Sequence, residues 1–174
     1  LGRRALIFGA VAGTIPDLDI ILYPMLNNIN RLYWHRGESH SILFVITASI
    51  LLSFLLRKKI EKKFSLSRFT TGLFLIFSTH ILIDVFTVYG TQILAPFSRY
   101  GFALGNMFII DPLYTIPLIA GIISAIIFKY KGFKAVYAGL AISSVYIIFS
   151  LVSHSYADNF FKSHLKSKNI NVKL

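Results

Sequence analysis

Apolar residues run in long stretches along this chain, with most of the polar residues between them. Five hydrophobic segments can be marked, at about residues 5–26, 41–56, 69–89, 107–128 and 135–152. A helix that crosses the hydrocarbon core of a bilayer needs about 20 mainly apolar residues, and all but the second segment come close to that length. We therefore expect an all-α, polytopic helical membrane protein with about five hydrophobic segments.

The first segment contains a break. Pro16 follows Gly13 and precedes the sequence Asp-Leu-Asp. Proline lacks a backbone donor and disfavours helix in the residue before it, so we expect a kinked or broken helix at this motif. From residue 153 onward the chain is polar and basic. We therefore predict a helical transmembrane domain at residues 1–152 and a polar tail at residues 153–174.

Composition supports a lipid environment. Apolar residues make up 55% of the chain, charged residues only 14%, and the mean hydropathy is +0.67. The chain contains no cysteine, which excludes disulfides and thiolate zinc sites. Any metal must therefore be held by nitrogen and oxygen. The chain opens Leu-Gly-Arg-Arg without a signal-peptide pattern, and we expect it to be a piece of a longer protein.

The net charge of +11 is explained by its distribution. The chain start and the loops at residues 57–68 and 129–134 share one predicted side of the membrane and hold 11 of the 18 Lys and Arg residues. The opposite loops and the tail hold the other seven. By the positive-inside rule the first side is cytoplasmic, so we expect an integral protein of a prokaryotic plasma membrane and no nucleic-acid partner.

Five of the seven acidic residues and three of the five histidines lie inside or beside the hydrophobic segments. They form four clusters, at residues 16–19, 35–41, 80–84 and 111–112. Ionisable side chains at membrane depth are costly and are candidates for a functional site by default. The topology places all four clusters in the non-cytoplasmic half of the membrane, and we expect them to form one site.

Two clusters have the spacing of paired metal ligands. His80 and Asp84 are four residues apart, so on a helix they share one face. Paired ligands have this spacing in helical metallohydrolases, but a simple His–Asp hydrogen bond is an equally good interpretation. Asp17 and Asp19 can both approach one cation if the helix break is extended or a turn. One of them can instead cap the next helix, and we expect Asp19 to be the better ligand.

The densest cluster is the stretch HRGESHS at residues 35–41. His35 and His40 can bind metal, Arg36 can hold an anionic oxygen with two hydrogen bonds, and Glu38 can act as a general base or a further ligand. In the alternative interpretation, Ser39 caps the next helix and Glu38 pairs with Arg36. Asp111 also has a plain structural interpretation, because Asp followed by Pro is a common helix start.

Together these motifs resemble the YdjM-like family of membrane-bound metal-dependent hydrolases. The matching stretches are residues 13–19, 35–41, 80–92, 96–98 and 108–115. They occur in order over roughly residues 3–120. The resemblance implies a polytopic membrane protein assigned as a hydrolase, with the motif His and Asp residues as metal ligands. The substrate of the family is poorly defined.

We therefore expect a membrane metallohydrolase that binds one or two divalent transition-metal ions, zinc before manganese or iron. The candidate ligands are Asp17, Asp19, His35, His40, His80, Asp84 and Asp111. Seven ligands exceed the three of a typical catalytic zinc and suit two metals about 3.5–4 Å apart. Glu38 would relay a proton, and Arg36 would stabilise the transition state. The candidate substrate-binding residues are Arg36, Ser39, Thr87 and Tyr89.

A site in the outer leaflet favours a lipid or lipid-linked phosphoester as substrate, with a peptide or amide bond left open. The alternative function is a metal-ion or proton transporter or channel that uses the same His/Asp cluster, since transporters build ion sites at broken helices. The one-sided position of the clusters and the lack of an inverted repeat argue against it. A third possibility is a scaffold with a structural metal. The oligomeric state is left open.

Overall fold

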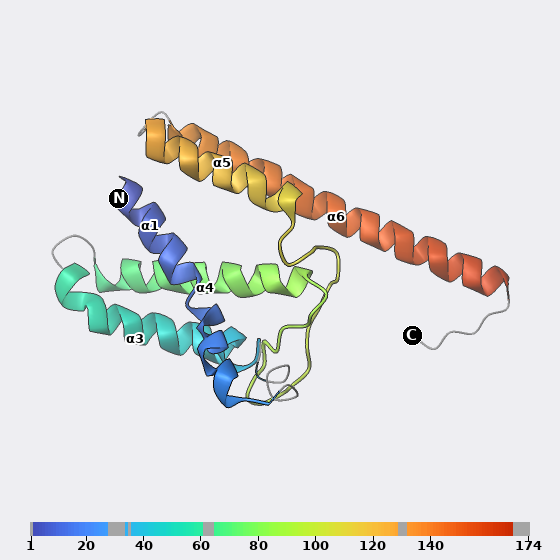
Figure 1. Cartoon of the computed structure of the whole chain (residues 1–174), viewed down its shortest axis with the longest axis horizontal. Helices are drawn as coiled ribbons and strands as arrows, with labels where there is room; N and C mark the ends of the chain where they lie inside the picture. Colours follow the sequence, from blue (N-terminus) through green and yellow to red (C-terminus); the bar gives the residue numbers. More distant parts are fainter. Residues whose placement is uncertain (1, 28–33, 35, 61–64, 129–131, 169–174) are drawn as a thin grey trace. The chain divides into compact units, whose positions relative to one another are not determined.

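The computed structural model describes residues 2–27, 34, 36–60, 65–128 and 132–168 (Figure 1). Every regular element in these ranges is a helix, and Thr91 and Phe102 form an isolated antiparallel bridge. The predicted all-α class is confirmed. The chain divides into two compact units, Leu1–Gly105 and Asn106–Leu174, and each is described by itself.

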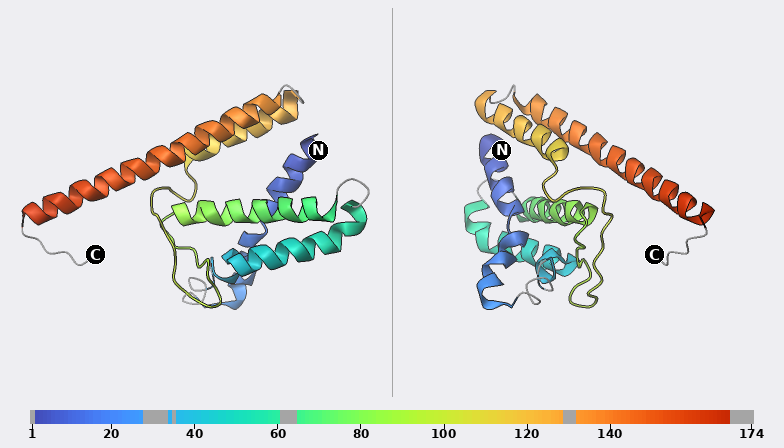
Figure 2. Two further views of the ribbon diagram at one scale, coloured as in Figure 1. Left: turned by 180° about the vertical axis from the view of Figure 1, so that it is seen from behind. Right: turned by 45° about the vertical axis from the view of Figure 1, so that its right-hand side comes forward.

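The first unit is built on an antiparallel helix pair. Its elements are α1 (Gly2–Gly13), the 3₁₀ helices η1 (Pro16–Met25) and η2 (Glu38–His40), α3 (Ile42–Ile60) and α4 (Leu66–Phe86). Helices α3 and α4 lie side by side, and α1 packs against α4 (Figures 1 and 2). The element η2 directly precedes α3 and packs against both α3 and η1. Short polar segments are thereby brought to the C-terminal half of α4.

The first hydrophobic segment is broken where the sequence predicts. Helix α1 ends at Gly13 and the chain resumes at Pro16 as a 3₁₀ helix, with an angle of 46° between the two parts. Pro16 occupies the first turn of η1, where its missing N–H removes no hydrogen bond. The break places Asp17 at the start of a new helix.

A stripe of apolar side chains on α4 forms the core of the first unit. Leu73, Phe77 and Ile81 are spaced four residues apart and are buried against Val45 of α3 and Ala12 of α1. Side chains at this spacing share one helix face. His80 and Asp84 follow Phe77 and Ile81 by three positions each, so a well-packed helix holds them in place.

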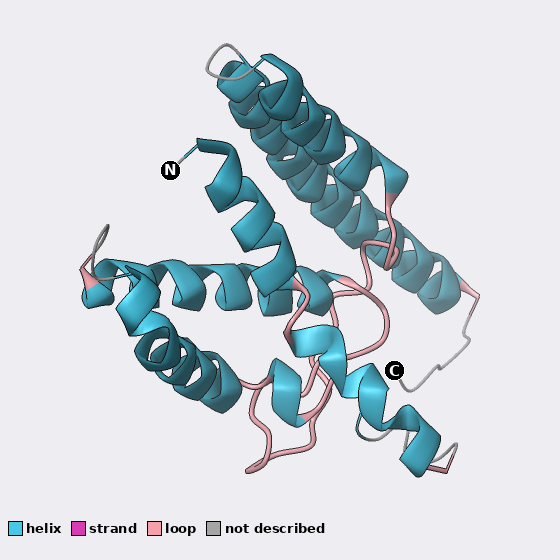
Figure 3. Ribbon diagram, turned by 60° about the vertical axis from the view of Figure 1, so that its left-hand side comes forward, coloured by secondary structure: helices cyan, strands magenta, loops and turns pink. Residues whose placement is uncertain are grey.

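The segment after α4 is a long loop that returns to the start of α3 (Figure 3). Thr91 and Phe102 exchange two backbone hydrogen bonds, and Gly90 adopts a φ of +79° close to the backbone of Gly101. The N–H of Gln92 donates to the carbonyl oxygen of Arg36. This hydrogen bond attaches the loop to the polar cluster that contains Arg36.

The second unit is a helical hairpin of α5 (Pro112–Phe128) and α6 (Phe133–Ser167). Small residues line its interface: Gly121, Ala125, Gly139 and Ser143 are all buried. Ser143 donates a hydrogen bond to the carbonyl oxygen of Tyr114 at 2.7 Å. Small residues let helix backbones approach closely, as is common in membrane proteins.

Some of the helices have the length and composition of membrane spans. Among the described residues, α4 and α6 are long and apolar enough to cross a bilayer, and a third span is present if the bent pair of α1 and η1 counts as one. Helix α5 is apolar but has only 17 residues. The structure thus supports a helical membrane protein, but it does not confirm the predicted count of about five segments.

Helix α6 continues without interruption past residue 153, where the sequence analysis begins the polar tail. At 1.5 Å per residue its 35 residues span about 52 Å, well beyond a hydrocarbon core of about 30 Å. The polar C-terminal part therefore lies on the same helix as an apolar part. The division at residue 152 is one of composition, and it stays a prediction.

Candidate metal centre

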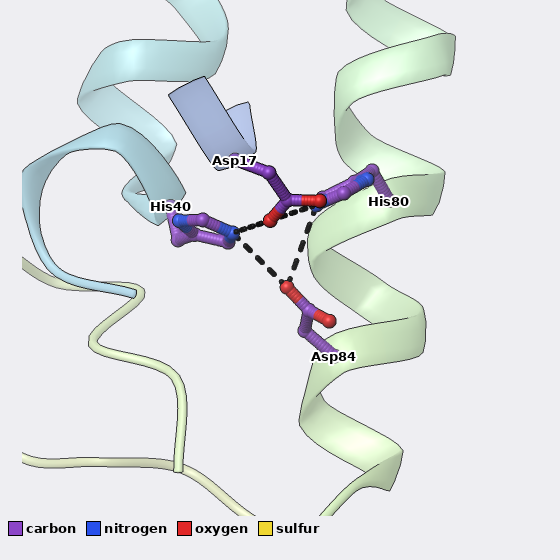
Figure 4. Close-up of side chains that lie close together, drawn as sticks. All are labelled: Asp17, His40, His80 and Asp84. Atoms are coloured by element: carbon purple, nitrogen blue, oxygen red, sulfur yellow. Dashed lines mark hydrogen bonds and ion pairs between the residues drawn. The ribbon is translucent and has the colours of Figure 1, made fainter. Parts of the chain in front are cut away.

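Four ligand atoms from three separate segments converge on one point (Figure 4). Asp17 comes from η1, His40 from η2, and His80 and Asp84 from successive turns of α4. Their ligand atoms all lie within 4.8 Å of one another. In the described residues this is the one group of its kind, and it joins three of the four clusters that the sequence predicts to meet.

The distances in this group suit a single metal ion. His40 Nε2 lies 3.2 Å from Asp17 Oδ1 and 3.1 Å from Asp84 Oδ2. His80 Nε2 lies 3.5 Å from each of the same two oxygens. A tetrahedral ion with ligand bonds of about 2.0–2.1 Å has edges of about 3.3–3.4 Å between its ligands. The four His–Asp distances therefore match the edges of a zinc-like site.

Two polar atoms at the centre have no hydrogen-bond partner. Within the described part of the chain, His80 Nε2 and Asp84 Oδ2 are buried and have only the close His–Asp contacts of the centre itself. A buried polar atom without a partner is costly. Asp17 and Asp84 also carry two negative charges between two imidazoles, a balance that a divalent cation would complete. The donor set fits a transition metal that prefers nitrogen and oxygen ligands.

Arg36 orients the carboxylate of Asp84. Its Nη2 lies 3.2 Å from Asp84 Oδ1, the oxygen that faces away from the two histidines. Its Nη1 donates to Thr87 Oγ1 at 2.6 Å, and the Thr87 hydroxyl donates to the backbone carbonyl of Asp84 at 2.7 Å. The guanidinium also lies 5.6 Å above the ring of Tyr89. These contacts fix Asp84 with its other oxygen directed at the centre.

A second chain of contacts orients His40. Ser39 Oγ lies 2.9 Å from His40 Nδ1 and 3.5 Å from Asp19 Oδ2. When the Ser39 hydroxyl donates to Asp19, its oxygen accepts from Nδ1–H, which leaves the lone pair of Nε2 for a metal. Outer contacts of this kind fix the tautomer and ring orientation of histidine ligands.

The two carboxylates of the helix break have different roles, which corrects the expected ranking. Asp17 joins the converging group, whereas Asp19 accepts hydrogen bonds from the backbone N–H of Arg36 and from Ser39. In an extended segment or a turn, as expected from the sequence, both carboxylates could reach one ion. In a 3₁₀ helix successive residues are about 120° apart, so side chains two positions apart point in different directions.

Glu38 pairs with a residue that the sequence analysis did not select. Its carboxylate forms an ion pair with Arg99, which also donates to Gln92. The guanidinium of Arg36 contacts Asp84 and Thr87 instead. The hydrogen bond from Arg99 lowers the pKa of Glu38, which makes it a weaker base. A lone arginine in an otherwise uncharged loop was the available signal for Arg99. The general-base role of Glu38 stays a prediction.

The proposed substrate-binding residues differ in accessibility. Arg36 and Thr87 are buried and bonded to each other and to Asp84, so the structure gives them a positioning role. Ser39 is half-buried against His40. Tyr89 is exposed and packs beneath Arg36. Contacts of these four residues with a substrate stay predictions.

Asp111 and His35 are the two remaining candidate ligands. Asp111 belongs to the second unit, where it is buried, accepts a hydrogen bond from Tyr146 at 2.7 Å and accepts one from the N–H of Leu113 at 3.1 Å. It therefore begins α5 as a helix cap, which is its plain structural role. His35 lies outside the described residues. The converging group accounts for one ion, and a second ion stays a prediction.

These features define a class: a helical membrane protein with a His/Asp cluster arranged as a potential metal site. The chain belongs to the YdjM inner membrane protein family, whose model matches residues 2–157. This confirms the resemblance inferred from the sequence motifs and supports a membrane location, without showing which loops face the cytoplasm.

One curated relative is also similar to the chain. It is an uncharacterized protein, YfhP, of Bacillus subtilis (strain 168), and it is 32% identical over 146 residues. The match covers 83% of this chain and 42% of the relative, so the chain spans about two fifths of the length of that protein. No solved structure matches the chain.

Proposed function

We propose that this chain carries the metal centre of a membrane-embedded hydrolase. The observation that supports the proposal is the convergence of Asp17, His40, His80 and Asp84, with His–Asp distances of 3.1–3.5 Å. Contacts from Arg36 and Ser39 orient Asp84 and His40. Ionisable groups next to membrane spans are costly, and a cluster of four is a functional site by default.

Each residue of the site has a defined task in this proposal. His40, His80, Asp84 and Asp17 hold a divalent transition metal, with zinc the first choice and manganese or iron the others. Such an ion supplies Lewis acidity, which activates water and polarises the bond to be cleaved. Arg36 keeps Asp84 oriented, and Ser39 keeps the tautomer of His40. Glu38, paired with Arg99, is the candidate proton relay at the rim.

The surroundings of the site favour an amphipathic substrate. The Asp17 side chain is 54% exposed, so the centre is open on that side. The neighbouring apolar residues Leu18 and Ile21 on η1 are also exposed, as is Val88 after α4. A substrate with an apolar part can cover these side chains while its polar bond reaches the metal. We propose a lipid or lipid-linked phosphoester, in the non-cytoplasmic leaflet.

Metal analysis of purified protein tests the proposal. We expect one equivalent of a transition metal in the native chain and its loss in His80→Ala and Asp84→Ala. His154→Ala, an exposed residue of α6, serves as the control and should keep the metal. A metal-loaded protein should then hydrolyse a phosphoester in detergent micelles. If the native chain binds no transition metal after reconstitution, the hydrolase proposal fails.

A metal-ion or proton transporter is the second candidate. The observation in its favour is the broken first span, since half-helices that meet at a break build the ion sites of transporters. Flux separates the two functions. Metal-dependent ion movement into sealed proteoliposomes, without phosphoester cleavage, would replace the hydrolase with a transporter.

A further inference from the structure

The side chains of the four residues in the candidate metal centre differ in how far they are buried. The side chain of His40 is fully buried, and those of Asp84 and His80 are 13% and 19% exposed. The Asp17 side chain is 54% exposed. Asp17 is therefore much more exposed to solvent than the other three ligands.

Packing also distinguishes Asp17 from the other three ligands. His80 and Asp84 lie on α4 beside its buried stripe, and the second oxygen of Asp84 is fixed by Arg36. His40 is fixed through its Nδ1 by Ser39. Contacts outside the centre therefore hold Asp84 and His40 with or without an ion, and His80 is held by its place on the packed helix α4.

Asp17 has no comparable support. It lies in the first turn of η1, directly after the break between two helices. Within the described part of the chain, its carboxylate forms hydrogen bonds or ion pairs only with His40 and His80. Nothing but the centre itself therefore holds the Asp17 side chain, and it faces the open side.

We infer that Asp17 is the displaceable ligand of the centre and that His40, His80 and Asp84 are its permanent ligands. Two histidines and one carboxylate with open positions are a known arrangement for catalytic metals, whereas four fixed protein ligands make a closed structural site. Asp17 would close the site at rest and leave its position to an anionic oxygen of the substrate. One ligand leaves as another enters, and no electron is transferred. This inference rests on the proposed function.

Metal affinity is the first test, measured by competition with a chromophoric chelator. We expect Asp17→Asn to keep one equivalent of zinc with about a tenfold loss of affinity, in the range of a supporting residue. Asp84→Asn should lose at least 100-fold. Asp158→Asn, on α6 and paired with Lys162, is the matched control and should change nothing. An equal loss in Asp17→Asn and Asp84→Asn would overturn the inference and leave the proposed function intact.

Phosphate binding is the second test, because it gives a readout other than activity. The protein is loaded with cobalt(II), and inorganic phosphate is titrated while the visible absorption of the metal is followed. Asp17→Asn should bind phosphate several-fold more tightly than the native chain, since no carboxylate competes for the position. Asp19→Asn removes the same charge two residues away and should not reproduce the gain.

The remaining outcomes of this titration are also decisive. Unchanged or weaker phosphate binding by Asp17→Asn would overturn the inference, as would an equal gain in Asp19→Asn, which would assign the effect to charge alone. A native chain that binds neither zinc nor cobalt would remove the proposed function, and the inference with it.

Discussion

At the scale of single residues, Arg36 connects the metal centre to its surroundings. Its guanidinium contacts Asp84 and Thr87 with two different nitrogens, and its backbone carbonyl accepts from the loop at Gln92. Its φ of +55° lies in the left-handed region, which is uncommon for a residue with a side chain. The segment therefore accepts backbone strain in order to place this side chain.

This arrangement predicts that lysine cannot replace Arg36. A lysine carries a single nitrogen and cannot hold Asp84 and Thr87 at once. We expect Arg36→Lys to lower metal affinity by about 10- to 100-fold, the range for residues that orient a ligand. Arg57→Lys is the matched control, since Arg57 lies exposed over the ring of Phe54. Chelator competition gives both affinities, and equal values for the two variants would contradict the positioning role.

The pKa of His40 leads to a second prediction at this scale. Burial lowers this pKa, but hydrogen bonds and charges from Asp17 and Asp84 raise it by more, so the net shift is upward. A group with a raised pKa stabilises the fold fully below its unfolded pKa, about 6.5, and loses that contribution as the pH rises through the folded value. The metal-free protein should therefore become less stable as the pH rises through the folded-state pKa of His40.

With zinc bound, the stability of the protein should instead increase as the pH rises. Binding requires a neutral imidazole, so the affinity should fall as the pH drops below the pKa of His40. Thermal unfolding between about pH 6 and pH 9, with chelator and with zinc, measures both slopes. His40→Gln should flatten the two curves. Parallel curves for the metal-free and zinc-loaded native protein would show that His40 does not titrate in competition with the metal.

Residue-level features were unevenly predictable from the sequence. The His80–Asp84 pair follows from a four-residue spacing on any helix, so the sequence was sufficient. The choice between Asp17 and Asp19 depends on the local helix type, which short polar motifs do not specify. The pairing of Glu38 with Arg99 joins residues 61 positions apart. No local pattern encodes such a contact, because it depends on how the loop after α4 folds back.

At the scale of elements, the hairpin of α5 and α6 depends on close backbone contact. A Cβ atom at Gly121 would lie 2.8 Å from the carbonyl oxygen of Ala135, and one at Gly139 would overlap the carbonyl oxygen of Pro117. Real Cβ atoms do not approach backbone so closely. The two helices can therefore pack in this way only with glycine at both positions.

Gly139→Ala is therefore expected to separate the hairpin helices and destabilise the protein by about 1–3 kcal/mol, the usual cost of overpacking. Gly72→Ala is the matched control, because Gly72 lies inside α4 with no atom within 4 Å of an added Cβ. Alanine there should be neutral or stabilise by up to about 1 kcal/mol. Unfolding in detergent measures both changes. Equal stability of the two variants would contradict the close packing.

The elements themselves were largely predictable, because long apolar runs and proline determine them. The sequence indicated the break at Pro16 and a helical segment around His80, and the structure confirms both. It did not indicate that the residues after the break form a 3₁₀ helix, since Pro16 marks where the first helix ends and not which helix type follows. The length of α6 was also missed, because hydropathy marks only the apolar part of a helix that continues to Ser167.

At the scale of the whole molecule, the side of the membrane that each loop faces determines how a substrate reaches the site. The Lys/Arg-rich segments at residues 57–68 and 129–134 predict a cytoplasmic location for those loops. The loop that follows α4 would then face the other side. Because this loop bonds to Arg36, the orientation also decides from which side a substrate reaches the metal centre.

The absence of cysteine from the chain makes this orientation directly measurable. Lys58→Cys places a thiol near the end of α3, and Tyr100→Cys places one in the loop after α4, both at exposed positions. We expect a membrane-impermeant maleimide to label Tyr100→Cys in cells without an outer-membrane barrier, and to label Lys58→Cys only after the membrane is opened. The reverse pattern would place the metal centre toward the cytoplasm. It would then require a cytoplasmic substrate, while the geometry of the centre itself would be unaffected.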